Sequence, residues 1–159
     1  MQISTRHTYH ADPQSVVEMM ANEVWLTAVA RAAGAERWQV SADIAGSRVL
    51  AEVPAPDKAK PFTGPVLKID LTSVWQPPSL NGNREGRIQV AIEGMPASMG
   101  GTGEMIHLGR VTEVDFKAEF RVNLPLIGRS LEAAAAPYVR RVIDTQQAVG
   151  NDYLAGRLA

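Results

Sequence analysis

Three histidines are the residues of this chain best suited to acid–base chemistry or metal binding. His7 and His10 are three positions apart, and in an extended strand that spacing turns their side chains to opposite faces. His107 is distant in the sequence, so the three do not show the spacing of a metal site. The chain has no cysteine, which excludes thiolate nucleophiles and cysteine-bound metals. We therefore expect no metal site and no cofactor. His7 is the histidine to follow, because its strand face also carries Ile3 and Tyr9.

A glycine-rich stretch, Gly100-Gly101-Thr102-Gly103, superficially resembles a phosphate-binding loop. A P-loop also needs a following Lys-Ser/Thr pair and a helix whose N-terminus meets the phosphate, and neither follows here. Glycines inside a strand mark a bulge or a close approach of backbone, which is the interpretation we adopt. The Gly-x-Ser-x-Gly elbow of serine hydrolases is absent as well, so the sequence contains no catalytic signature.

Most carboxylates fall where water is expected. Glu93, Glu113, Asp115 and Glu119 occupy the polar faces of alternating segments. Glu104 belongs to a segment whose two faces are hard to distinguish. Turned into an apolar cavity, its carboxyl group would have a raised pKa and could act as an acid or a base. We favour the outward position, in which Glu104 is an ordinary solvated charge.

Charge and hydropathy restrict the partners and the location. The 16 Lys and Arg residues are balanced by 17 Asp and Glu residues, so no positive surplus is available to neutralise phosphates, and we expect no nucleic-acid partner. The first ten residues contain no apolar signal segment, and no stretch approaches the roughly 18 apolar residues that cross a bilayer. We therefore expect a cytoplasmic protein without membrane insertion. The sequence leaves the oligomeric state open.

Alternating side chains predict that most of the chain forms strands. The clearest run is 111–122, where apolar side chains face one way and charged side chains the other. Such alternation is typical of an antiparallel sheet with one buried face and one solvent-exposed face. Residues 2–10 and several segments between 37 and 108 follow the same pattern. The proline-rich segment 54–65 is predicted to be a long loop.

Helices are predicted near both ends of the chain. Asp12-Pro13 suits the start of one short helix, and Asn22 could begin a second. After Gly128 the period changes to that of a long helix, which Pro137 is expected to kink or divide. The apolar stripe of this helix comprises Leu131, Ala135, Tyr138, Val142, Val149 and Tyr153.

A strand, two short helices, a run of antiparallel strands and a long final helix make up the order of elements in the START-like superfamily, also called SRPBCC or helix-grip. At the residue level the chain resembles an actinobacterial START-like family of unknown function. The resemblance is carried by YHADPQSV (9–16), GMPASMGGTG (94–103) and VNLPLIGRSLE (122–132). It implies a single α+β domain over residues 1–159. In that domain a curved antiparallel sheet of six or seven strands is crossed by the last helix.

The same resemblance implies an apolar cavity between sheet and helix, used elsewhere in the superfamily for sterols, lipids, plant hormones and polyketides. Our first hypothesis is a non-enzymatic domain that binds a small apolar molecule, such as a lipid, a polyketide or an aromatic compound. The residues we expect to contact it are Trp75, Val90, Phe116, Tyr138 and Val142. Aromatic and methionine side chains on inward faces fit this hypothesis, although they fit a filled core equally well.

Two other functions stay open. A polyketide cyclase or dehydratase would use the same cavity together with an inward Glu104 or His7, because such chemistry needs a titratable group within hydrogen-bond reach of the ligand. A filled core would instead indicate a protein-interaction domain that acts through an exposed apolar patch. The lining of the cavity and its volume distinguish these functions from the first hypothesis.

Overall fold

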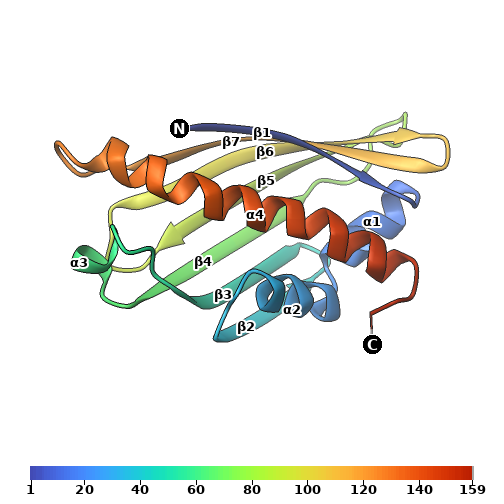
Figure 1. Ribbon diagram of the computed structural model, residues 1–159. Helices are drawn as coiled ribbons and strands as arrows, with labels where there is room; N and C mark the ends of the chain where they lie inside the picture. Colours follow the sequence, from blue (N-terminus) through green and yellow to red (C-terminus); the bar gives the residue numbers. More distant parts are fainter. Residues whose placement is uncertain (159) are drawn as a thin grey trace.

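The computed structural model describes residues 1–158 and consists of a seven-stranded antiparallel sheet with a long helix across one face (Figure 1). The strands are β1 (Gln2–Tyr9), β2 (Arg37–Asp43), β3 (Gly46–Pro54), β4 (Val66–Trp75), β5 (Arg84–Ile92), β6 (Ala97–Leu108) and β7 (Val111–Val122). Their order across the sheet is β1-β7-β6-β5-β4-β3-β2, and each neighbouring pair is antiparallel. The predicted helix-grip fold of the α+β class is confirmed.

The helices are α1 (Pro13–Met20), α2 (Glu23–Ala32), α3 (Lys60–Thr63) and α4 (Gly128–Leu154). The predicted caps are present: the side chain of Asp12 accepts a hydrogen bond from the backbone of Ser15, and that of Asn22 from the backbone of Val24. The segment predicted to be only a loop contains the short α3, which corrects that expectation. Helix α4 continues through Pro137 without being divided.

Side chains of α4 hold the edge strand β1 by its backbone. Gln147 Oε1 accepts from the N–H of Thr8 at 2.7 Å. Asn151 accepts from the N–H of His10 at 3.0 Å and donates to the carbonyl of Thr8 at 2.9 Å. These bonds satisfy polar groups at an otherwise open sheet edge. They also fix the C-terminal half of α4 over the sheet face that we call the inner face.

The inner face carries two separate clusters of buried side chains. The first, which we call the packed end, joins β1, β6 and β7 to α1 and α2: Tyr9, Val16, Met19, Met20, Trp25, Leu26, Met105 and Val114. The second, which we call the distal cluster, lies at the start of α4: Ala97, Phe120, Val122 and Leu131. Helix α4 approaches the packed end closely because Gly150 lacks a side chain, and a Cβ there would collide with the ring of Tyr9.

Candidate functional site

The middle of the inner face, between the packed end and the distal cluster, stays partly exposed. Its partly exposed apolar side chains come from four adjacent strands: Leu71, Ile88, Val90, Met99, Phe116 and Ala118. On α4, Val142 is also partly exposed, and helical periodicity places it between Leu131 and Val149 on the stripe that faces the sheet. We call this surface, with Val142 above it, the inner groove.

An aromatic row bounds the inner groove toward the packed end. The indole of Trp75 lies over Gly86 and Gly103, where an added Cβ would come within 2.7 Å of ring carbons. The indole meets the ring of Phe116 edge-on, with centroids 6.3 Å apart. Phe116 in turn meets the ring of His7 edge-on at 5.3 Å. The two glycines therefore give the indole room to lie across β5 and β6.

Smaller side chains form the floor of the inner groove. Strand pairing aligns Ser47, Ser73, Ile88, Gly101 and Ala118 in one row across β3, β4, β5, β6 and β7. The neighbouring row toward the distal cluster carries mostly larger side chains: Val49, Leu71, Val90, Met99 and Phe120. The side chains of the floor row are therefore smaller than those of the neighbouring row on β3, β4, β6 and β7, whereas on β5 Ile88 is larger than Val90.

A small hollow lies under the first turns of α4, beside the distal cluster. Its volume is about 40 Å³, enough for about one water molecule or a methyl group. Leu67 and Ile92 line it from the sheet, Leu131 and Ala135 from α4, and Ala59 from the segment that contains α3. The lining side chains are apolar, so the hollow suits a hydrocarbon group and not a polar one.

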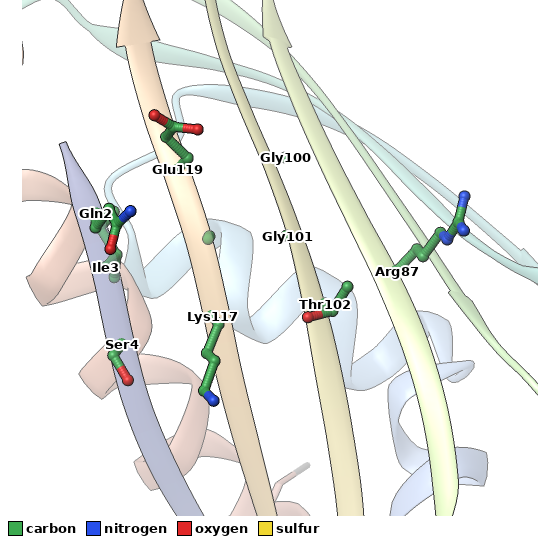
Figure 2. Close-up of a pocket in the computed structure, with 10 residues that line it drawn as sticks. Gln2, Ile3, Ser4, Arg87, Gly100, Gly101, Thr102, Lys117 and Glu119 are labelled. Atoms are coloured by element: carbon green, nitrogen blue, oxygen red, sulfur yellow. The ribbon is translucent and has the colours of Figure 1, made fainter.

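A larger hollow, of about 750 Å³, lies on the opposite, solvent-facing side of the sheet, and Figure 2 shows it with the helices behind the strands. Gly100 and Gly101 lie at its base, and a Cβ at Gly100 would meet nothing within 4 Å. Exposed polar and charged side chains of β1, β5, β6 and β7 surround it. One of them, Glu119, is paired with Arg121 at 2.7 Å. This open surface contains no buried polar group that would fix a ligand, so we place the candidate site in the inner groove.

The glycine-rich segment and Glu104 both belong to the unbroken strand β6. Pairing runs without interruption from Ala97 to Leu108 against β7, so no bulge is present. A Cβ at Gly101 would lie 2.6 Å from the carbonyl oxygen of Lys117, which confirms the close approach of backbone. Glu104 is exposed on the outer face, as favoured.

Within residues 1–158, no three histidine or acidic side chains gather to hold a metal ion, and no helix is long and apolar enough to cross a bilayer.

His7 lies inside the fold and is only 2% exposed. Its Nδ1 is hydrogen-bonded to the hydroxyl of Tyr9 at 3.1 Å, whereas its buried Nε2 has no hydrogen-bond partner. Burial lowers the pKa of His7 below its ordinary value, and the nearby carboxylate of Asp144 and the backbone of Ile143 only partly oppose this. The ring is therefore neutral at pH 7. Phe116 lies between His7 and the floor of the inner groove.

Four of the five predicted contact residues line or roof the inner groove and are partly exposed: Trp75, Val90, Phe116 and Val142. Tyr138 differs, because it is 48% exposed and the guanidinium of Arg141 lies 5.9 Å from its ring centre. The next residue, Val139, is less exposed than Tyr138. Ser47 and Ser73 are not among the predicted contacts, and their only signal in the sequence is their inward place in alternating strands.

The sequence matches the family described as protein of unknown function (DUF2505) over residues 4–154. The chain belongs to this family. No curated protein matches the sequence.

Solved structures with the same architecture are distant in sequence. A START superfamily protein from Mycobacterium smegmatis is 11% identical, with a TM-score of 0.53, and 92% of this chain and 94% of that chain are covered. Human STARD10 is 8% identical, with a TM-score of 0.64, and 98% of this chain and 65% of that chain are covered. A third structure is a point mutant of Thalictrum flavum norcoclaurine synthase in complex with a transition-state analogue. It is 10% identical, with a TM-score of 0.57, and 97% of this chain and 96% of that chain are covered. The TM-scores and the coverage of this chain show a shared START-like fold, and at these identities the likeness extends to the fold alone.

Proposed function

We propose that this domain binds a small apolar molecule in the inner groove and is not itself an enzyme. One observation supports the proposal above all: the apolar side chains of the groove stay partly exposed beneath α4. At the packed end the same sheet buries such side chains completely. A ligand that covered Leu71, Val90 and Met99 would remove apolar surface from water, at about 25 cal/mol for each Å².

The proposed contacts are the predicted ones, with Tyr138 at the edge of the site. Trp75, Phe116 and Val90 would contact a ligand from the sheet, and Val142 from α4. Tyr138 is close enough to α3 to affect Lys60, whose pKa is raised chiefly by Asp57 and to a lesser extent by Tyr138. Ala59, next to Lys60, lines the apolar hollow. Because Tyr138 is 48% exposed, we propose it as a contact at the edge of the site.

The alternatives fit less well. Glu104 faces solvent, so an enzyme acting in the groove would depend on His7, and Phe116 lies between that ring and the groove floor. The exposed large apolar side chains are spread over separate elements, for example Ile44, Leu80 and Leu126, which does not favour an apolar interaction patch. The cytoplasmic location and the actinobacterial family stay predictions.

Native mass spectrometry of protein purified from its own host tests the proposal, and a retained small apolar molecule is the expected result. A substitution pair sharpens it. Val90→Phe places a larger side chain in the groove, whereas Val74→Phe places one on the exposed face of the neighbouring strand β4. We expect Val90→Phe to weaken binding of an apolar fluorescent probe at least about 10-fold, while Val74→Phe leaves it unchanged. A parent protein without retained ligand or probe binding contradicts the proposal.

A further inference from the structure

Two serines face each other on the floor of the inner groove. Ser47 of β3 and Ser73 of β4 are directly paired across the strands, and their Oγ atoms are 2.8 Å apart. Ser47 is 8% exposed and Ser73 is partly exposed. Ser73 is the more exposed of the two and adjoins the groove residues Leu71 and Ile88, so a molecule in the groove would reach the pair through Ser73.

The pair has one hydrogen-bond donor to spare. Two hydroxyl groups hold two donor hydrogens, and a single bond between them uses only one. Neither Oγ has a further hydrogen-bond partner among residues 1–158. Thr112, a buried hydroxyl elsewhere on the inner face, shows the usual arrangement, because its Oγ1 donates to the carbonyl of Ala11 at 2.7 Å. The spare O–H of the serine pair has no such acceptor.

The apolar surroundings make it costly to cover this spare donor with a group that cannot accept a hydrogen bond. The rest of the floor row is Ile88, Gly101 and Ala118, none of which offers a polar side-chain atom. Ser73 is partly exposed, so water can accept this hydrogen while the groove is empty. A ligand that covers the pair has to supply an acceptor in place of that water, because a covered donor without a partner costs about 1–3 kcal/mol.

We infer that the Ser47–Ser73 pair is the polar anchor of the inner groove and donates a hydrogen bond to an acceptor oxygen of the ligand. This inference rests on the proposed function and adds a ligand class to it. The low floor between Trp75 and Leu71 suits a flat ring system. The groove as defined contains no charged side chain, which disfavours a charged ligand. The ligand class is therefore a planar, uncharged, mostly apolar molecule with a carbonyl oxygen, such as an aromatic ketone or a quinone.

Two fluorescent probes of nearly equal shape test the anchor. One is an acyl-dimethylaminonaphthalene, whose ketone accepts a hydrogen bond, and the other is the corresponding alkyl-dimethylaminonaphthalene, in which a methylene group replaces the ketone. Their affinities are measured on the parent, on Ser47→Ala/Ser73→Ala, and on Ser41→Ala/Ser98→Ala, whose serines are exposed. We expect the anchor variant to bind the ketone probe about 3–10-fold more weakly, the loss of one net hydrogen bond. The emission of the ketone probe bound to the anchor variant should also lie at shorter wavelength than that of the probe bound to the parent, because the hydrogen bond to the ketone is lost.

Affinity for the ketone-free probe should not change in any variant, and Ser73→Thr, which keeps a hydroxyl group, should retain the affinity of the parent for the ketone probe. An anchor variant that binds the ketone probe as tightly as the parent overturns the anchor and leaves the proposed function standing. A parent that binds neither probe overturns the proposed function itself. If the double variant does not fold, the single variants give the same comparison. Ser73→Ala loses the hydroxyl group of residue 73, whereas Ser73→Thr keeps it.

Discussion

The packed end and the inner groove are built from the same strands with the same alternation, yet only the packed end is filled. Strand β7 shows the change within a few residues. Val114 is fully buried, Phe116 is partly exposed, and Phe120 is again buried at 7% exposure. Helices α1 and α2 add side chains such as Met19 over the first of these positions, whereas α4 alone crosses the middle. The helices above the sheet, and not the strand pattern, decide where this fold is filled.

The largest effect of a substitution should therefore come from the packed end. We expect Tyr9→Ala to lower the free energy of unfolding by about 3–5 kcal/mol, as large aromatic truncations in cores do. The change empties a fully buried site and also removes the hydrogen-bond partner of His7 Nδ1. Urea unfolding measures it. Tyr138→Ala, a change of the same kind at an exposed position, should cost less than about 1 kcal/mol. Similar losses for the two variants would contradict the burial pattern.

Trp75 lies on the border between the two regions and should give an intermediate loss. Its indole packs against the packed end and Phe116, but part of it stays exposed to the groove. We expect Trp75→Ala to cost clearly less than the about 3–5 kcal/mol of a buried ring, because part of its surface has no protein partner. Binding of an apolar probe to the native protein should change as well. A full core-sized loss together with a parent that binds no probe would favour a filled core.

Adding volume separates the two regions in the opposite direction. Val114→Phe should cost about 1–3 kcal/mol, because the packed end has no room for the larger ring. Val90→Phe should change the free energy of unfolding by less than about 0.5 kcal/mol, since the ring can extend into the open groove. Urea unfolding of both variants measures the difference. Equal costs would mean that the groove is as tightly packed as the core.

The fold could be predicted from the sequence because local signals and strand alternation agree. Asp12 and Asn22 mark the helix starts, and the alternation of 111–122 separates the inner from the outer face of the sheet. The inward position of Trp75 follows from the same pattern. The length of α3 and the unbroken course of α4 through Pro137 depend on tertiary contacts, which local propensity does not contain.

The site could be predicted only in part, because alternation gives the face of a side chain but not what covers it. Val90 and Val114 have the same pattern in the sequence and differ in burial. A helical stripe read from the sequence is uncertain by about one residue, and at this level of α4 Tyr138 is 48% exposed whereas Val139 is less exposed. The serine pair joins residues from two strands, and their contact depends on the register between β3 and β4.

The smallest expected effect concerns His7, which the packed end encloses as a neutral ring. Burial lowers its pKa from the ordinary value of 6.5, so the unfolded chain takes up a proton at this histidine more readily than the folded chain does. The contribution of His7 to stability is therefore complete above about pH 6.5 and is lost as the pH falls through its lowered pKa. The slope for one such group is at most about 1.4 kcal/mol per pH unit.

Urea unfolding at about pH 7.5 and about pH 5.5 measures this loss, because the ordinary pKa of histidine lies between the two values. His7→Gln cannot titrate, so we expect its free energy of unfolding to fall less between the two pH values than that of the parent. His10→Gln, at the exposed position directly after Tyr9, should behave as the parent does. Carboxyl groups such as Asp115, whose pKa is lowered by the Arg6 guanidinium, remain ionised over this range and do not obscure the comparison. If the parent and His7→Gln lose the same stability, the packed end does not keep His7 neutral.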